Sequence, residues 1–183
     1  RACVLIFRSG RKTLSACPPN AVGAAIRDPE LTLNLPRGLT AATGMDAISH
    51  CLETFCSPRV NPPADAIALD GLVRTTGHIE TVVNDGGNRE ARWQMLMGAM
   101  EGGLAFQKGL GAVHALSHPL GTLQLHHGTL NAILLPHVLA YNSGHLVTKT
   151  ARMREALGLK PGTDLPRFFS DIRDRLGIPG RLS

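Results

Sequence analysis

Hydrophobic side chains recur at the spacing of a helix face through most of the chain beyond Gly38. The segment 43–55 shows the pattern clearly, because its apolar residues stand three or four positions apart: Met45, Ile48, Leu52 and Phe55. Residues at that spacing share one face of an α-helix, and that face can be buried against another helix. The pattern therefore favours a mostly helical fold.

Caps and breaks divide this helical part into separate elements. Asn61 and Pro62 supply an N-cap and a first-turn proline, and Asp85 with the two glycines after it interrupts the pattern. The predicted helices span 43–55, 62–83, 88–104, 112–123, 127–142, 147–157 and 165–176. Short linkers rich in glycine and proline separate them, as in a helical bundle.

The helix predicted over 88–104 contains three internal glycines: Gly98, Gly102 and Gly103. A glycine inside a helix costs about 1 kcal/mol relative to alanine. We therefore expect another helix, in this chain or in a second copy, to pack closely there.

Residues 1–36 have a different pattern from the rest of the chain. The apolar run from Cys3 to Phe7 predicts a short strand, and prolines punctuate the residues that follow it. We therefore divide the chain into a strand-bearing segment, 1–36, and a helical domain, 37–183.

The composition is that of an ordered chain with one core. Of the 183 residues, 43% are hydrophobic and 18% are charged, which excludes a disordered or collagen-like chain. No apolar run approaches the roughly 20 residues of a membrane span, and the first ten residues lack a signal-peptide cleavage site. The four cysteines have no CxxC spacing, which favours reduced, packing thiols. We expect a cytoplasmic protein without a membrane partner.

The net charge of +5 does not indicate a nucleic-acid partner. The 19 Lys and Arg residues are dispersed along the chain and are opposed by 14 Asp and Glu residues. Aromatic residues make up 4% of the chain, too few for a base-stacking platform. We therefore expect no binding to nucleic acid.

Asp46 and His50 form the first candidate for a chemical site. They stand four positions apart in a predicted helix, so both side chains can converge on one cation. The alternative interpretation is structural. In that case Thr43 and Asp46 form a capping box at the start of the helix, and His50 only packs.

More histidines lie in or beside the later apolar helices. His114 and His118 are also four positions apart, so they could be two ligands, a ligand and a proton-transfer group, or structural residues. The adjacent His126 and His127 point about 100° apart on a helix, so only one would reach a given ion. His137 lies about 15 Å further along that helix, outside any shared site. Spacing alone selects no member of either pair.

The candidate residues together suit a particular kind of metal ion. One carboxylate and three imidazoles favour a borderline divalent ion such as Fe(II) or Zn(II) and disfavour Ca²⁺ or Mg²⁺. Such an ion acts as a Lewis acid, which polarises a carbonyl group or lowers the pKa of an alcohol.

Four motifs occur in order along the chain: 28–32 (DPELT), 39–50 (LTAATGMDAISH), 111–121 (GAVHALSHPLG) and 127–137 (HGTLNAILLPH). With these motifs the chain resembles the iron-containing (group III) alcohol dehydrogenase family from about Asp28 onward. The resemblance implies an NAD- or NADP-linked oxidoreductase that acts on a small-molecule alcohol or carbonyl compound, as a homodimer or larger homo-oligomer. It also implies a helical metal- and substrate-binding domain over 37–183. Residues 1–36 would then be a remnant of an N-terminal α/β dinucleotide-binding domain.

The same resemblance selects among the candidate residues. Carried over position by position, it implies four metal ligands: Asp46, His50, His114 and His127. The metal would be Fe(II), with Zn(II) as the alternative. His118 would face the nicotinamide and the substrate, where it could position them or relay a proton.

One part of the family's pattern does not occur in these 183 residues. The GGGS phosphate loop and the GTGSE segment that bind the cofactor are absent, and Gly109 and Gly111 lack the strand–turn–helix context that would replace them. We therefore expect the chain to be part of a longer enzyme. Two alternatives stay open. One is a non-catalytic helical module for metal binding or oligomerisation, and the other is a structural domain whose histidines belong to the core.

Overall fold

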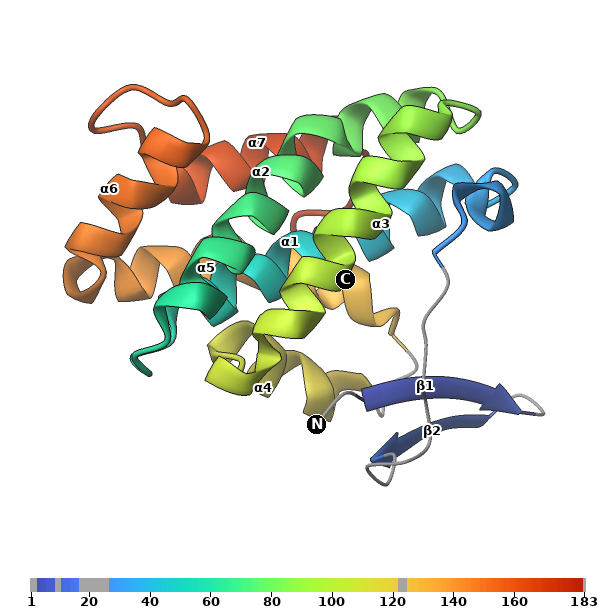
Figure 1. The fold of residues 1–183 in the computed structure, drawn as a ribbon, viewed down its shortest axis with the longest axis horizontal. Coiled ribbons are helices and arrows are strands. Elements are labelled where there is room, and N and C mark those ends of the chain that lie inside the picture. Colours follow the sequence, from blue (N-terminus) through green and yellow to red (C-terminus); the bar gives the residue numbers. More distant parts are fainter. Residues whose placement is uncertain (1–2, 9–10, 17–26, 122–124, 183) are drawn as a thin grey trace.

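The structure, a computed structural model, describes residues 3–8, 11–16, 27–121 and 125–182 (Figure 1). The chain begins with strands β1 (Cys3–Arg8) and β2 (Arg11–Ala16) and the short 3-10 helix η1 (Pro29–Thr32). The helices that follow are α1 (Arg37–Cys56), α2 (Pro62–Asn84), α3 (Arg89–Leu104), η2 (Ala105–Lys108), α4 (Ala112–Leu120), α5 (His127–Asn142), η4 (Ser143–His145), α6 (Val147–Ala156) and α7 (Leu165–Arg175). The predicted, mostly helical fold is confirmed.

Helix α1 lies in the middle of the bundle (Figure 1). It packs against α2, α3 and α5, and it also contacts α4. The residues that define its predicted apolar face are all buried: Met45, Ile48, Leu52 and Phe55. Because neighbouring helices surround α1, polar side chains on it face other helices rather than water.

Helix α1 begins at Arg37 rather than at residue 43. Thr43 is therefore inside the helix, where its hydroxyl donates a hydrogen bond to the carbonyl oxygen of Leu39 at 2.8 Å. A residue inside a helix cannot serve as its N-cap. The capping-box interpretation of Thr43 and Asp46 is wrong.

The close packing predicted at the glycines of α3 is found at two of the three. A Cβ atom on Gly98 would lie 2.5 Å from Cγ2 of Thr75 on α2, and one on Gly102 would lie 3.0 Å from Sγ of Cys51 on α1. A Cβ atom on Gly103 would meet nothing within 4 Å. Gly98 and Gly102 thus let α3 approach its neighbours closely, whereas Gly103 has no such role.

The other helices lie close to their predicted ranges. Asn61 caps α2 by accepting a hydrogen bond from the backbone N–H of Ala64. Asn88 caps α3 in the same way, by accepting one from the backbone N–H of Ala91. Helix α4 ends at Leu120, three residues before its predicted end at 123, and the difference falls partly on residues outside the described ranges. The 3-10 segments were not predicted, because they are too short to leave a periodic pattern.

The first two strands form an antiparallel hairpin in which Cys3 pairs with Ala16. Strand β1 contains the predicted strand, while its polar partner β2 was not predicted. Residues 27–36 pack against the helices instead, because the guanidinium of Arg89 on α3 donates to the carboxylate of Glu30. The division at residue 36, and the origin of residues 1–36 in a dinucleotide-binding domain, stay predictions.

Two of the four cysteines can be placed in the fold. Cys51 is buried and Cys56 is half-buried, and both are free thiols. Burial is the main reason that the pKa of each thiol rises to about 12, so both stay protonated and unreactive. The side chains of Cys3 and Cys17 lie outside the described residues. In the described part of the chain, no helix has the length and apolarity of a membrane span.

Candidate metal centre

Helix α1 presents Asp46 and His50 on the same side, as their spacing predicted. Nε2 of His50 lies 3.6 Å from Oδ1 of Asp46. Both side chains are mostly buried, with exposed fractions of 21% for His50 and 22% for Asp46. A carboxylate and an imidazole at this separation are close enough to share one cation.

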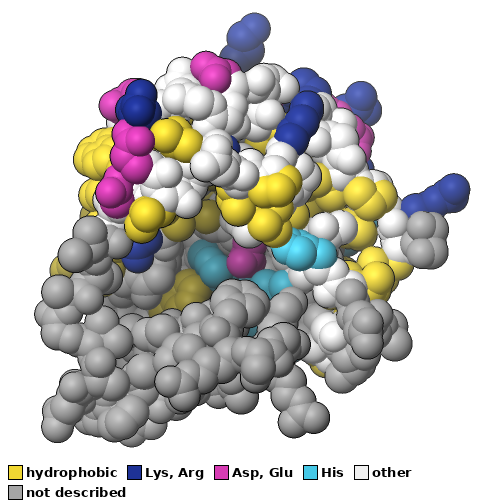
Figure 2. All heavy atoms as spheres, turned by 90° about the vertical axis from the view of Figure 1, so that its right-hand side faces the viewer, with side chains coloured by type: hydrophobic (Ala, Val, Ile, Leu, Met, Phe, Trp, Pro, Cys, Tyr) yellow, Lys and Arg dark blue, Asp and Glu magenta, His cyan; other side chains and the backbone are white. Residues whose placement is uncertain are grey.

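Helices α4 and α5 bring two more imidazoles to the same carboxylate oxygen. Nε2 of His114 lies 3.3 Å from Oδ1 of Asp46, and Nε2 of His127 lies 3.6 Å from it. The donor atoms of Asp46, His114 and His127 all lie within 4.8 Å of one another, which is the arrangement of a candidate metal site. Figure 2 shows histidine side chains gathered around an acidic one in a hollow of this face.

His50 lies at the edge of this three-residue group. Its ring stacks on that of His114 at a centroid distance of 4.5 Å, and its other neighbour is the edge of the Phe106 ring at 4.7 Å. Phe106 thus borders the centre from η2 as well as packing in the fold. The three predicted imidazole ligands, His50, His114 and His127, thus all lie near the carboxylate of the fourth, Asp46. His50 is not a member of the three-residue donor group.

The first turn of α5 comes very close to the backbone of α1. A Cβ atom on Gly128 would lie 2.2 Å from the carbonyl oxygen of Ala42, far inside van der Waals contact. Only glycine permits this approach. Because His127 precedes Gly128, the close approach carries the His127 imidazole to Asp46.

Asn131, one turn after His127, occupies the middle of the group. Its amide nitrogen donates to Oδ1 of Asp46 at 2.6 Å and lies 3.1 Å from Nε2 of His114 and 3.0 Å from that of His127. Its own Oδ1 is buried without a hydrogen-bond partner. Oδ1 of Asp46 and the Nε2 atoms of His114 and His127 thus surround the amide nitrogen of Asn131. Such a donor set fits a cation better than it fits the two hydrogens of one amide.

Glu53 is a further residue of the site that the sequence analysis missed. It lies on α1 with 3% of its side chain exposed, and its Oε2 is 2.6 Å from Nδ1 of His114. The signal in the sequence was its position seven residues after Asp46, on the same helix face. Asn131 had a similar signal, four residues after His127.

The protonation states of the site follow from burial and from these contacts. Burial opposes a charge on His114, but hydrogen bonds to Asp46 and Glu53 outweigh it and raise the pKa of His114 to about 9. Burial likewise opposes a charge on Asp46, but His114 and the nearby imidazoles lower the pKa of Asp46 to about 2. Burial dominates at His50 and lowers its pKa to about 4. Near neutral pH, Asp46 is charged and His50 is neutral, which are the forms that bind a metal, whereas His114 is protonated and must release a proton when a metal binds.

The remaining candidate histidines lie around the group rather than in it. The exposed His118 stacks against His127 with a centroid distance of 5.3 Å, and its ring is 5.9 Å from that of His114. His126 and His137 are exposed, and neither belongs to the donor group found among the described residues. The structure thus brings His118 beside the centre, on its exposed side.

The geometry defines a helical domain that carries a candidate site for one transition-metal ion. Residues 40–182 match the model of the Fe-containing alcohol dehydrogenase family, C-terminal part. The chain belongs to this family of enzymes.

Individual relatives agree with this assignment. The chain is 50% identical to the 4-hydroxybutyrate dehydrogenase of Cupriavidus necator, with 100% of this chain and 50% of the relative covered. It is 41% identical to the NAD-dependent methanol dehydrogenase of Bacillus methanolicus over 70% of this chain and 33% of that enzyme. The solved structure of an iron-containing alcohol dehydrogenase from Thermococcus thioreducens superposes with a TM-score of 0.84 at 27% identity, over 97% of this chain and 47% of that one. The chain therefore spans half the length of these relatives or less.

Proposed function

We propose that this chain is the metal- and substrate-binding part of an NAD- or NADP-linked alcohol dehydrogenase. It would interconvert a small alcohol and the corresponding aldehyde or ketone. The observation that carries the proposal is the convergence of one carboxylate and three imidazoles from α1, α4 and α5 at one partly buried point. The relatives named as 4-hydroxybutyrate and methanol dehydrogenases support a small alcohol as the substrate.

In this proposal Asp46, His50, His114 and His127 hold the ion, and Asn131 donates a hydrogen bond to the carboxylate. A bound Fe(II) or Zn(II) would supply Lewis acidity toward a substrate oxygen, and NAD or NADP would accept or donate the hydride. The side chains contribute orientation, because they are held by packing on three helices.

We assign His118 to the substrate side of the centre. Its ring lies against His127 but is exposed, so one face is open to a ligand. An imidazole there can exchange a proton with a substrate hydroxyl. The name of the Bacillus relative supports NAD as the cofactor. We also propose that the protein forms a homodimer or larger homo-oligomer and lies in the cytoplasm.

The ligand assignment is tested by substituting Asp46→Ala and measuring the metal content after anaerobic purification. We expect wild-type protein to retain Fe or Zn in a fixed ratio to the chain, and Asp46→Ala to lose the metal and, in the longer enzyme that contains this part, the NAD(P)-linked oxidation of 4-hydroxybutyrate or simple alcohols. Asp171→Ala, which removes a half-exposed carboxylate on α7, is the matched control and should retain both. Normal metal content in Asp46→Ala would remove Asp46 from the centre. Metal retention without nucleotide-linked turnover in the longer enzyme would favour the non-catalytic module instead.

A further inference from the structure

Glu53 is a buried carboxylate that connects α1 to α4. Its Oε1 accepts a hydrogen bond from the backbone N–H of Val113 at 2.6 Å. Its Oε2 accepts one from the backbone N–H of His114 at 3.3 Å and one from Nδ1 of the same residue at 2.6 Å. All three donors thus belong to the first turn of α4.

The carboxylate replaces a cap that α4 does not have in its own sequence. The residue at the N-cap position is Gly111, which offers no side-chain acceptor to the first-turn N–H groups. A carboxylate near a helix N-terminus is also favoured by the helix dipole. Gly111 itself leaves the space for it, because a Cβ atom there would lie 2.7 Å from Oε1 of Glu53.

The same carboxylate determines how the His114 ring is presented. Since Nδ1–H of His114 donates to Glu53, Nε2 is the nitrogen that faces Asp46 at 3.3 Å. A ligating histidine commonly donates its other ring N–H to a carboxylate, which fixes the tautomer and increases the basicity of the ligating nitrogen. Glu53 stands in that relation to His114.

We propose that Glu53 is the positioning residue of the metal centre. It fixes the rotation and the tautomer of His114, and it anchors the turn that carries this ligand to the helix that carries Asp46 and His50. The inference rests on the proposed function, because it assumes that an ion binds at His114.

The proposal is tested by the affinity of the full chain for Zn²⁺, measured by competition with a chromophoric chelator, and by the absorption spectrum of the Co²⁺-substituted protein. Glu53→Gln keeps the size of the side chain but offers one acceptor oxygen instead of two. We expect it to bind Zn²⁺ about 10- to 100-fold more weakly than the wild type and to give an altered Co²⁺ spectrum.

Asp164→Ala is the matched control, since Asp164 caps α7 by accepting a hydrogen bond from the backbone N–H of Arg167, away from the centre. In the presence of a chelator, both variants should unfold at a lower temperature than the wild type, because each loses a helix cap. Only Glu53→Gln should also lose affinity for Zn²⁺. Wild-type affinity in a folded Glu53→Gln would overturn the inference and leave Glu53 as a helix cap alone. No binding of Zn²⁺ or Co²⁺ by the wild type would instead refute the proposed function.

A second measurement does not depend on a variant that folds. In nitrogen-15 spectra of the Zn²⁺-bound wild type, we expect the side chain of His114 to show a protonated, hydrogen-bonded Nδ1 and a metal-bound Nε2. A metal-bound Nδ1 would overturn the proposal.

Discussion

At the residue scale, the candidate function depends on a few polar side chains placed on otherwise apolar helices. Asp46, His50 and Glu53 form a polar stripe on α1, the most enclosed helix of the fold. Burying such groups is unfavourable unless each finds a partner. Here the partners come from other helices, since His114 contacts both Asp46 and Glu53. The polar stripe is therefore stable only when α4 and α5 are in place.

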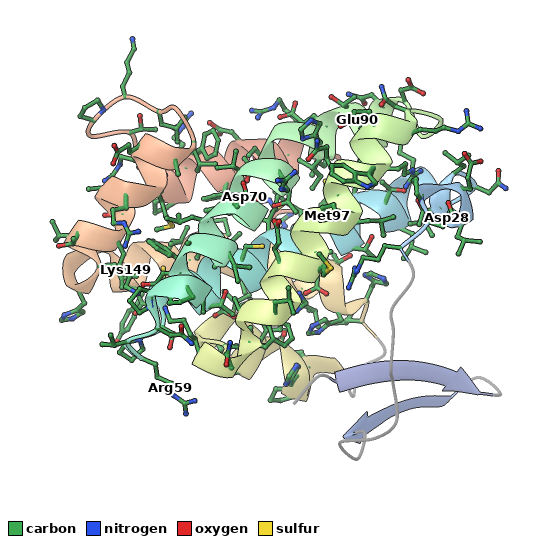
Figure 3. All side chains as sticks on the ribbon, in the orientation of Figure 1. Asp28, Arg59, Asp70, Glu90, Met97 and Lys149 are labelled. Carbon is green, nitrogen blue, oxygen red and sulfur yellow. The ribbon has the colours of Figure 1, made fainter. Side chains whose placement is uncertain are left out.

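A prediction at the residue scale concerns Glu101 on α3. Its carboxylate lies 3.3 Å from the guanidinium of Arg74, which also pairs with Asp70 on α2. Figure 3 labels Asp70 on that helix. Burial, followed by the hydrogen bond and the negative charge of Asp70, raises the pKa of Glu101 to about 7. A raised pKa in the folded state means that stability is fully present below the ordinary pKa of a glutamate and is lost as the pH rises through about 7.

We therefore expect the melting temperature of the wild type to fall relative to that of Glu101→Gln as the pH rises from about 4.5 to 7. The comparison is made by thermal unfolding followed by circular dichroism. Glu90→Gln, at an exposed carboxylate of the same helix, is the control. Its melting temperature should change with pH in the same way as that of the wild type. A constant difference between wild type and Glu101→Gln across this range would contradict the raised pKa.

At the element scale, the site depends on how closely the helices approach one another. The predicted helix ranges were nearly right, but they say nothing about which helices touch. Gly128 in α5 and Gly98 in α3 allow backbones to approach to distances that a methyl group would prevent. The approach at Gly128 is the one that brings His127 to α1. Gly128 thus helps to decide the geometry of the centre, although it has no side chain that could bind an ion.

We predict that Gly128→Ala separates α5 from α1 and weakens metal binding. The new methyl group would overlap the carbonyl oxygen of Ala42, and such overpacking costs about 1–3 kcal/mol of stability. Gly103→Ala is the control, because open space surrounds that helical position, and it should raise stability by up to about 1 kcal/mol. Chemical denaturation and Zn²⁺ titration measure the two effects. Undiminished metal affinity in Gly128→Ala would show that His127 reaches the site without this close approach.

At the scale of the whole molecule, the four proposed ligands and their supporting residues all belong to the helical part. Residues 27–36 pack on α3, where Arg27 donates to the carbonyl oxygen of Leu96 and Glu30 pairs with Arg89. The hairpin of β1 and β2 precedes this segment. Metal binding should therefore be a property of the chain from residue 27 onward.

We predict that a chain beginning at Arg27 keeps both its helical content and its affinity for Zn²⁺. Circular dichroism and chelator competition compare it with the 183-residue chain. Nucleotide binding is measured in parallel by the fluorescence of NADH and NADPH. If removal of the first 26 residues abolished metal binding while the helices remained folded, the division of the chain into two functional parts would be wrong.

Periodicity and caps predicted the helical fold and most helix ends, whereas the four proposed ligands were predicted from the family motifs rather than from spacing. Local periodicity and capping suffice for helices, because they depend on residues a few positions apart. Only the tertiary structure decided that Asp46 meets His114 and His127, which lie more than sixty residues away in the sequence. It also revealed Glu53 and Asn131, since a polar residue in an apolar helix has no evident role until its partner on another helix is known. Contacts between distant segments depend on how whole helices pack, and the local periodicity of a short segment does not predict that packing.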